Sequence, residues 1–314
     1  MNIRPFRYSD LAALIQIADV SFADEYTSRG ETPESFAKQI RGVARGRMIP
    51  FRLVTALAGY KWEMFVAEVD GRVVGCGGYI GSKEMELSNL MVHPQYRRRG
   101  IGQALLEKRL QRLAEGGYPF VTTTILASNQ ASLGNVTKQG FVVFDRYTIL
   151  EARLPLLRHS NISEGTVVAR LIQPSDKEAF KHLERRISSP LWLQYQGSAA
   201  PSYFLSFGER MMNRFSNTLQ WAQAFSRNDV IVGFLAAITS RSQTAGVLPR
   251  PVIADENLHL LPAMLYEAAN WLEQQGKITI QVAVPDERIA ILGQLESSGW
   301  TKTQSWVRLV KLFT

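Results

Sequence analysis

The chain has 314 residues, 46% of them hydrophobic and 20% charged, with a formal net charge of +8. Its one cysteine excludes an intramolecular disulfide and a cysteine-cluster metal site, and its four histidines lack metal-ligand spacing, so we expect no metal cofactor. No apolar run approaches the ~18 residues that a membrane span requires, and the N-terminus lacks an apolar leader core. The sequence therefore predicts a cytoplasmic protein of about two domains that does not act on membranes.

The basic excess is shared along the chain, with five charges in residues 1–155 and three in the remainder. Its densest cluster is Arg97-Arg98-Arg99. No zinc-finger, RNA-binding or helix-turn-helix pattern accompanies this cluster, so nucleic acid is not an expected partner. An anionic small molecule accounts for it as well as a nucleic-acid backbone does.

In chain order, the first half opens with a short strand at 2–7 and a helix that Ser9-Asp10 caps and that ends near Phe22. A second helical region is expected at 33–56. Two apolar runs flank Asp70-Gly71 and predict a β-hairpin. The further elements are expected at 87–92 (strand), 101–115 (helix), 120–126 (strand), 129–139 (helix), and 141–144 and 147–150 (strands).

The stretch 86–105 carries the most chemistry. A strand ends at Pro94, and glycines stand where an amphipathic helix begins, at Gly100 and Gly102. A helix N-terminus offers unpaired N–H groups, and glycine lets an anion approach the backbone closely, so the stretch is a candidate phosphate cradle. The spacing matches neither the dinucleotide fingerprint nor the P-loop. A basic turn that caps a helix therefore remains the alternative.

Two motifs in sequence resemble those of the GNAT (GCN5-related N-acetyltransferase) family. Arg97-x-x-Gly100-x-Gly102 is similar to the acetyl-CoA signature of that family, and L-M-V-H-P before it is similar to the usual lead-in. The segment N-Q-A-S-L-G-N-V-T-K-Q-G-F at 129–141 is similar to the later N-x-x-[AS]…G-F motif. The resemblance covers roughly residues 1–150.

The resemblance implies an α/β (α+β) fold with a mixed, mostly antiparallel twisted sheet flanked by helices. It also implies acetyl transfer from acetyl-CoA to a primary amine by direct attack, the acceptor being a small molecule or a peptide or protein N-terminus. Two neighbouring strands would splay apart around the pantetheine arm. The residues that would bind the cofactor are Leu90, Met91, Val92, Arg97, Arg98, Arg99, Gly100, Ile101, Gly102, Gln103, Asn129 and Ser132.

Glu86 corresponds to the catalytic glutamate of one GNAT branch, and we expect it to accept the proton of the substrate ammonium, directly or through water. Strand alternation predicts one shared face for Glu86, Ser88, Leu90 and Val92. For each of these residues a purely structural role stays open. Glu86 can be an exposed strand carboxylate, Asn129 a plain helix N-cap, Ser132 a small packing residue, and the arginines a solvated turn.

The general acid is a departure from the family pattern. Many members carry a tyrosine seven residues after the motif asparagine, and here that position is Val136. Tyr118 and Tyr147 lie in the same half, but the sequence does not place them at the thiol. Cys76 sits in an apolar, glycine-rich strand and is read as a buried structural thiol. A non-catalytic acyl-CoA-binding or partner-binding module therefore stays open beside the enzyme.

The second half repeats the element order of the first. Its elements are expected at 167–171 (strand), after Pro174 (helix), 204–216 (helix), 219–225 and 230–239 (hairpin), 247–254 (strand), 258–275 (helix), 278–284 (strand), 286–298 (helix) and 300–312 (strands). It lacks the cradle glycines and carries Asp255-Glu256 in that region. We therefore expect a catalytic domain at 1–152, a linker at 153–165 and a degenerate GNAT-like domain at 166–314. Four aromatic residues line either an acceptor groove or the core: Trp192, Tyr195, Tyr203 and Phe204.

Overall fold

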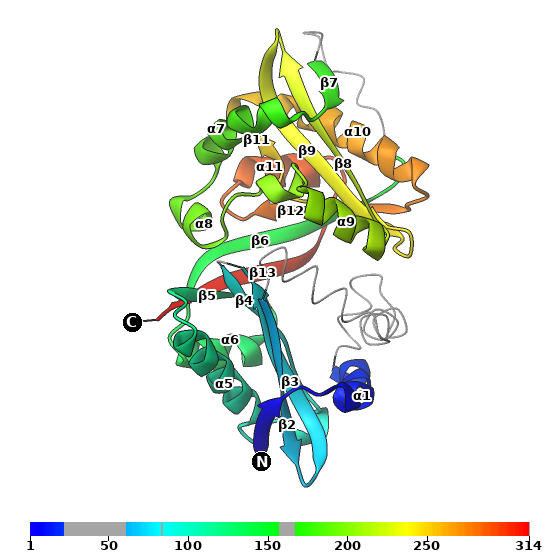
Figure 1. Ribbon diagram of the computed structural model, residues 1–314. Coiled ribbons are helices and arrows are strands. Elements are labelled where there is room, and N and C mark those ends of the chain that lie inside the picture. The colour runs from blue at the N-terminus through cyan, green and yellow to red at the C-terminus, as the bar shows by residue number, and fades with distance from the viewer. Residues whose placement is uncertain (22–60, 83, 157–166, 314) are drawn as a thin grey trace. The chain divides into compact units, whose positions relative to one another are not determined.

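The computed structural model describes residues 1–21, 61–82, 84–156 and 167–313 (Figure 1). Contacts divide the chain into two units. Unit 1 contains Met1–Phe144 and Val307–Thr314, and unit 2 contains Asp145–Trp306. The helical region expected at 33–56 and most of the expected linker lie outside the described residues.

Unit 1 is built on a mixed sheet whose strands lie in the order β1-β2-β3-β4-β5, followed by the end of β13. The strands are β1 (Asn2–Pro5), β2 (Lys61–Val69), β3 (Arg72–Gly81), β4 (Met85–Val92), β5 (Phe120–Leu126) and β13 (Thr301–Leu312). The pairs β1–β2, β2–β3 and β3–β4 are antiparallel, and β4–β5 is parallel. The helices are α1 (Leu11–Ser21), α5 (Ile101–Glu115) and α6 (Gln130–Lys138).

Helices cover both faces of this sheet (Figure 1). On one face, α1 buries Leu14 and Ile17 against Cys76 and Met91. On the other face, α5 contributes its apolar stripe to a larger cluster that includes Met85 and residues of β2, β5 and β13. The separation into two clusters follows from alternation along β3 and β4, which sends neighbouring side chains to opposite faces.

The hairpin predicted around Asp70-Gly71 is confirmed, since β2 and β3 pair directly across it. Both turn residues have positive φ, 49° and 73°, as a two-residue type I′ turn requires. The second predicted hairpin, in unit 2, is confirmed in the same way, with φ of 50° at Asn228 and 61° at Asp229. Local turn chemistry therefore sets the register of both strand pairs.

Unit 2 repeats the plan of unit 1. Its strands are β7 (Val167–Leu171), β8 (Thr218–Arg227), β9 (Val230–Ser240), β10 (Ala245–Leu248), β11 (Val252–Ile253) and β12 (Thr279–Pro285). Its helices are α7 (Lys177–Ile187), α8 (Pro190–Tyr195), α9 (Phe207–Ser216), α10 (Leu261–Gln274) and α11 (Ile289–Ser297). One core cluster contains the buried faces of α10 and α11, and another contains α7 with Tyr203. Tyr203 and Phe204 pack on Phe180. These two aromatic residues therefore belong to the core of unit 2 and do not line an acceptor groove.

Three strand expectations are corrected. A single strand, β6 (Val142–Arg153), replaces the two strands expected at 141–150, and from Asp145 onward it belongs to unit 2, where it pairs with β12. The terminal strand β13 is also single, and its last residues, from Val307, return to unit 1. The strand expected at 247–254 is split into β10 and β11 by Pro249-Arg250-Pro251, because proline lacks the N–H that a central ladder needs.

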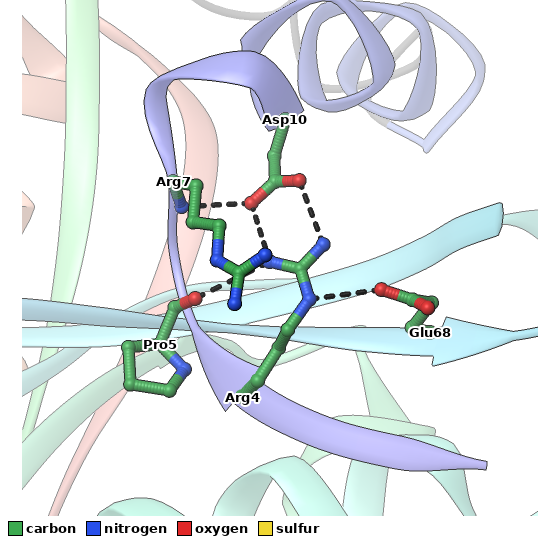
Figure 2. Close-up of polar contacts among 5 residues, drawn as sticks. All are labelled: Arg4, Pro5, Arg7, Asp10 and Glu68. Atoms are coloured by element: carbon green, nitrogen blue, oxygen red, sulfur yellow. Dashed lines mark hydrogen bonds and ion pairs between the residues drawn. The ribbon is translucent and has the colours of Figure 1, made fainter. Parts of the chain in front are cut away.

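Each unit begins with the same polar motif. In unit 1, Arg4 donates through both terminal nitrogens to the two carboxylate oxygens of Asp10, each at 2.8 Å, and through Nε to Glu68 at 2.8 Å (Figure 2). The backbone N–H of Arg7 also donates to Asp10, at 2.7 Å. In unit 2, Arg170, Asp176 and the N–H of Gln173 reproduce these bonds at 2.8, 2.8 and 2.7 Å. The repeat seen in the sequence is therefore a repeat of three-dimensional structure.

Candidate active site

The candidate anion cradle is the N-terminus of α5. Gly100 is its N-cap, and no side chain caps the helix. Among the described residues, the backbone N–H groups of Arg98 through Gln103 have no hydrogen-bond acceptor. The first turn of a helix cannot satisfy these groups internally, and they coincide with the positive end of the helix dipole. The segment therefore presents successive free donors to an incoming anion.

The two cradle glycines serve different purposes. Gly100 has φ of 76°, in the left-handed region, so glycine is required there by backbone conformation. Gly102 is helical, and a Cβ added to it would meet Asn135 Nδ2 at 3.8 Å and Val92 Cγ2 at 3.9 Å, which are ordinary contacts. The fold therefore leaves room for a side chain at Gly102, and a ligand that approaches the backbone would use the same space.

The three arginines are exposed and do not act alike. Arg97 donates through Nε to the carbonyl of Val92 at 3.1 Å, so it ties the turn to the end of β4. Arg99 lies over the ring of Tyr96 at 5.1 Å in a cation–π contact. Arg98 has a left-handed backbone, with φ of 61°. Its side chain is exposed, and no hydrogen bond or ion pair ties it to the part of the chain that the structure describes.

β4 contains a bulge at the centre of the candidate site. Its register against β3 shifts between Cys76 and Gly78, and Asn89 has φ of 53°. The parallel pairing with β5 covers Met85 to Leu87 and ends there. The bulge therefore lies where β4 and β5 stop pairing, which is the kind of opening that the resemblance implied between these strands.

The bulge also overturns the expectation of one shared face. Met85 and Leu87 belong to the cluster on the α5 side, so Glu86 and Ser88 face the α1 side. After the extra residue, Leu90 and Val92 pack on the α5-side cluster, and Met91 on the α1-side cluster. Glu86 and Val92 therefore lie on opposite faces, because one inserted residue inverts the alternation.

Glu86 is half-buried and has a partner on the neighbouring strand. Thr124 of β5 donates through Oγ1 to Glu86 Oε1 at 2.9 Å. Two residues further along β4, the hydroxyl oxygen of Ser88 is buried without a hydrogen-bond partner among the described residues. A carboxylate and a hydroxyl thus stand side by side on the α1 face, next to the end of the β4–β5 pairing.

Arg109 of α5 was not predicted from the sequence. It is 2% exposed and donates to the carbonyls of Leu105, Gly78 and Ser88 at 3.1, 3.2 and 3.4 Å. Burial lowers the pKa of its guanidinium to about 10. The two strand carbonyls flank the bulge, so Arg109 holds the bulge from the α5 side. The sequence did contain one signal for its burial. Arg109 lies four residues from both Leu105 and Leu113, so it falls on the apolar face of the helix.

The second motif folds as a helix start. Asn129 is the N-cap of α6, and its Oδ1 accepts the N–H of Ser132 at 3.0 Å, which confirms the capping alternative. Val136, in the place of the usual tyrosine, is 4% exposed and belongs to the core cluster with Leu106. The structure therefore does not offer residue 136 as an acid.

The corresponding region of unit 2 has a different character. Its α10 begins with a proline in the first turn, and the carboxylates of Asp255 and Glu256 precede it. Arg288, the N-cap of α11, donates to the carbonyl of Ile253 at 2.9 Å and to Asp255 Oδ1 at 2.8 Å. Within unit 2, the place that matches the cradle of unit 1 is therefore filled by protein groups.

Among the residues that the structure describes, no three His, Cys, Asp or Glu side chains are grouped to hold a metal ion. In the same residues, no helix is long and apolar enough to cross a bilayer.

The region that contains the candidate site is similar to proteins of known family. Residues 40–141 match the family model described as the acetyltransferase (GNAT) family. The GNAT family is therefore assigned to this region of the chain. Acetyltransferase SG1711 from Sodalis glossinidius (strain morsitans) is 36% identical over 91 residues, which are 28% of this chain and 63% of that protein. The chain thus spans less than two thirds of the curated relative that it matches.

The GNAT fold extends over the whole chain. A tandem GNAT protein from the clavulanic acid biosynthesis pathway aligns with 99% of this chain and 98% of its own, with a TM-score of 0.66 and 16% identity. A GCN5-related N-acetyltransferase from Sphaerobacter thermophilus aligns with 99% and 95%, with a TM-score of 0.64 and 15% identity. At such identities the likeness concerns the fold, and it shows that unit 2 shares the GNAT architecture.

Proposed function

We propose that this protein is an N-acetyltransferase that transfers an acetyl group from acetyl-CoA to a primary amine in a ternary complex. The single observation that carries the proposal is the uncapped start of α5, where the N–H groups of Arg98 through Gln103 have no acceptor in the part of the chain that the structure describes. The match of residues 40–141 to the GNAT family model supports acyl transfer as the reaction class. The catalytic domain of the proposal is 1–152, and 166–314 is a GNAT-like domain without a pyrophosphate cradle.

In this proposal the cofactor phosphates meet the α5 N-terminus, with Arg98 as the free side chain beside them. The pantetheine arm enters where β4 and β5 stop pairing, along Leu90, Met91 and Val92. Within that segment, the carbonyl of Val92 accepts from Arg97 Nε. Asn129 and Ser132 stand at the N-terminus of α6.

Glu86 is the proposed base. It accepts a proton from the substrate ammonium, directly or through water, and the neutral amine then attacks the thioester carbon. The bond from carbon to nitrogen forms as the bond to sulfur breaks, CoA leaves as the thiolate, and the nitrogen passes its remaining extra proton to that thiolate. Thr124 holds the carboxylate in place. With Val136 in the core, the thiolate leaves without a tyrosine at that position.

The acceptor class stays broad in the proposal, either a small amine or a peptide or protein N-terminus. The decisive measurement is calorimetry of acetyl-CoA with the purified, CoA-free full chain, followed by a screen of amine and peptide pools that reads out free thiol. Saturable binding and thiol release with one pool support the proposal. No binding of acetyl-CoA would remove it.

Gly102→Ala tests the role of the cradle in cofactor binding without disturbing the fold. The added methyl group fits the protein at 3.8 Å or more but occupies the approach to the free N–H groups. We expect acetyl-CoA binding to weaken tenfold or more, with a melting temperature that does not fall. Gly293→Ala is the matched control, because that helical glycine of unit 2 also has free space around it. Equal binding by both variants and the wild type would contradict the cradle.

The second candidate is a non-catalytic acyl-CoA-binding module. The burial of Val136 favours it, because the position of the usual acid is closed. Acetyl-CoA binding without thiol release across the whole amine and peptide panel would support this alternative over the enzyme.

A further inference from the structure

Two arginines of unit 2 are buried with donors that lack acceptors. Arg250 and Arg288 are each 8% exposed. The Nε and Nη1 of Arg250 and the Nη1 of Arg288 have no hydrogen-bond partner among the described residues. Buried guanidinium groups are normally paired or fully hydrogen-bonded, because an uncompensated buried charge is costly. Three such donors on two side chains therefore call for an acceptor that the protein itself does not supply.

Each of the two arginines occupies a position in unit 2 that corresponds to a position of the candidate active site in unit 1. Arg250 lies between β10 and β11, where the strand that matches β4 is interrupted, so it stands at the point that corresponds to the bulge of unit 1. Arg288 is the N-cap of α11, the place that Asn129 holds at α6. Where unit 1 carries a strand bulge and an amide, unit 2 thus carries two cations.

Hydrogen bonds and a cation–π contact hold the two arginine side chains in place, but some of their N–H donors stay without an acceptor. Arg250 donates through Nη2 to the carbonyl of Ile187 at 2.6 Å, and its guanidinium lies over the ring of Trp192 at 5.1 Å. Arg288 uses Nη2 for Ile253 and Asp255. The cation–π contact and the carbonyl bonds fix the planes of the two forks, which prepares the remaining N–H groups for a ligand.

The nearby carboxylates compensate the charge only in part. Glu287 Oε1 is 3.7 Å from Arg250 Nη2, beyond hydrogen-bond length, and its side chain is 48% exposed. The Asp255 side chain is 75% exposed. Burial and then the positive charge of Arg288 lower the pKa of Arg250, and the carboxylates of Glu287, Asp145 and Glu184 offset this decrease only in part. The two cations therefore act on one another through a poorly solvated region.

We propose that unit 2 binds the anionic group of a small molecule, a carboxylate or a phosphate, between Arg250 and Arg288. An oxyanion accepts from several N–H donors at once and neutralises both cations, and arginine forks match the geometry of either group. The site is distinct from the α5 cradle, lies wholly within residues 145–306, and does not depend on acetyl-CoA binding.

The test is calorimetric titration of the full chain with inorganic phosphate and, separately, with acetate, at constant ionic strength. We expect saturable binding of at least one of them, and the tighter probe identifies the group. Arg250→Lys and Arg288→Lys keep the charge but lose the fork, and each should weaken binding tenfold or more. Arg241→Lys, an exposed arginine of unit 2, is the matched control and should bind as the wild type does.

Two further variants separate this site from other anion sites. Arg98→Ala removes a side chain at the cradle of unit 1 and should leave the component lost in Arg250→Lys intact. Glu287→Gln removes one of the competing carboxylates and should tighten binding, whereas the exposed Glu273→Gln should not. Circular dichroism checks that each variant is folded.

A crystal of the wild-type chain soaked in selenate decides the matter if the lysine variants do not fold. An anomalous selenium peak between the two guanidinium groups supports the proposal. Ordered water alone at that place, or unchanged phosphate and acetate binding in folded Arg250→Lys and Arg288→Lys, overturns it.

Discussion

Glu86 faces the α1 side of its sheet, together with Ser88, and away from Leu90 and Val92. The proposed base therefore stands on the opposite face from Leu90 and Val92 and on the same face as Met91. Thr124 supplies the hydrogen bond that orients the carboxylate.

Glu86→Gln tests the base. A general base is needed only while the substrate amine is protonated, so kcat/KM should fall by about 100-fold or more below the pKa of the amine and approach the wild-type value above it. The measurement is the pH dependence of kcat/KM once an acceptor is known. Glu84→Gln is the control, because Glu84 is an exposed carboxylate just before β4. If the pH profile of Glu86→Gln ran parallel to that of the wild type, Glu86 would not be the general base.

Cys76 gives a prediction about stability. It is fully buried, as the sequence predicted, and burial raises its pKa to about 12. The unfolded thiol ionises at about pH 8.5, so the folded state keeps its proton longer, and the stabilisation present below that pH is lost as the pH rises toward the folded pKa. Between about pH 8 and pH 10.5 the wild type should lose about 2 kcal/mol more of its free energy of unfolding than Cys76→Ala does.

Urea denaturation of both proteins at the two pH values measures this difference. The comparison with Cys76→Ala measures the thiol together with its electrostatic coupling to Arg109. The native wild type should also resist a thiol reagent until urea unfolds it. Equal pH dependence in the two proteins would show that the thiol is not buried in solution.

At the scale of elements, the β3–β4 pair and α5 form one assembly. Arg109 crosses from the helix to the carbonyls of Gly78 and Ser88, and Gly77 makes room for its guanidinium. A Cβ at residue 77 would lie 3.1 Å from both Cζ and Nε of Arg109. The glycine-rich run of β3 therefore admits a buried cation beside the bulge.

Gly77→Ala should displace this cation and destabilise the protein by about 1–3 kcal/mol, the usual cost of overpacking. Gly134→Ala is the matched control. A Cβ at residue 134 meets nothing within 4 Å, and the position is helical, so alanine should stabilise by up to about 1 kcal/mol. Thermal denaturation followed by circular dichroism measures both. A neutral Gly77→Ala would mean that the Arg109 guanidinium does not pack against residue 77 in solution.

At the scale of the whole molecule, the two units share their opening motif and the burial of its aspartate, but not the burial of its arginine. The Arg4 and Asp10 side chains are 17% and 6% exposed, whereas Arg170 is 38% exposed. Exposed ion pairs contribute little, because water screens them. The same chemistry therefore stabilises unit 1 more than unit 2.

Asp10→Asn should cost about 2 kcal/mol, since it breaks a largely buried bidentate pair, and Asp176→Asn should cost less. The hydrogen bonds from Arg4 lower the pKa of Asp10. Its stabilisation is thus present above the unfolded pKa of about 4 and is lost as the pH falls toward the folded pKa. The gap between wild type and Asp10→Asn should shrink from about pH 5 to about pH 2 in urea denaturation. Asp229→Asn, at an exposed left-handed turn, is the neutral control.

The sequence alone determined the features that depend on local chemistry. The turns at Asp70-Gly71 and Asn228-Asp229 set their hairpins because few residues tolerate positive φ. Gly100 opened the helix that carries the candidate cradle, and Asn129 capped the next one. The repeated strand, turn and helix at the start of each half were readable for the same reason.

Only the tertiary structure decided the features that depend on packing between distant segments. The bulge at Asn89 inverted the faces of β4, because a single extra residue carries no mark in a period-two pattern. The buried positions of Arg109, Arg250 and Arg288 contradict the usual exposure of arginine, so composition alone pointed the other way. The return of β13 to unit 1 was equally hidden, since a strand's partner is chosen by the whole sheet rather than by its own residues.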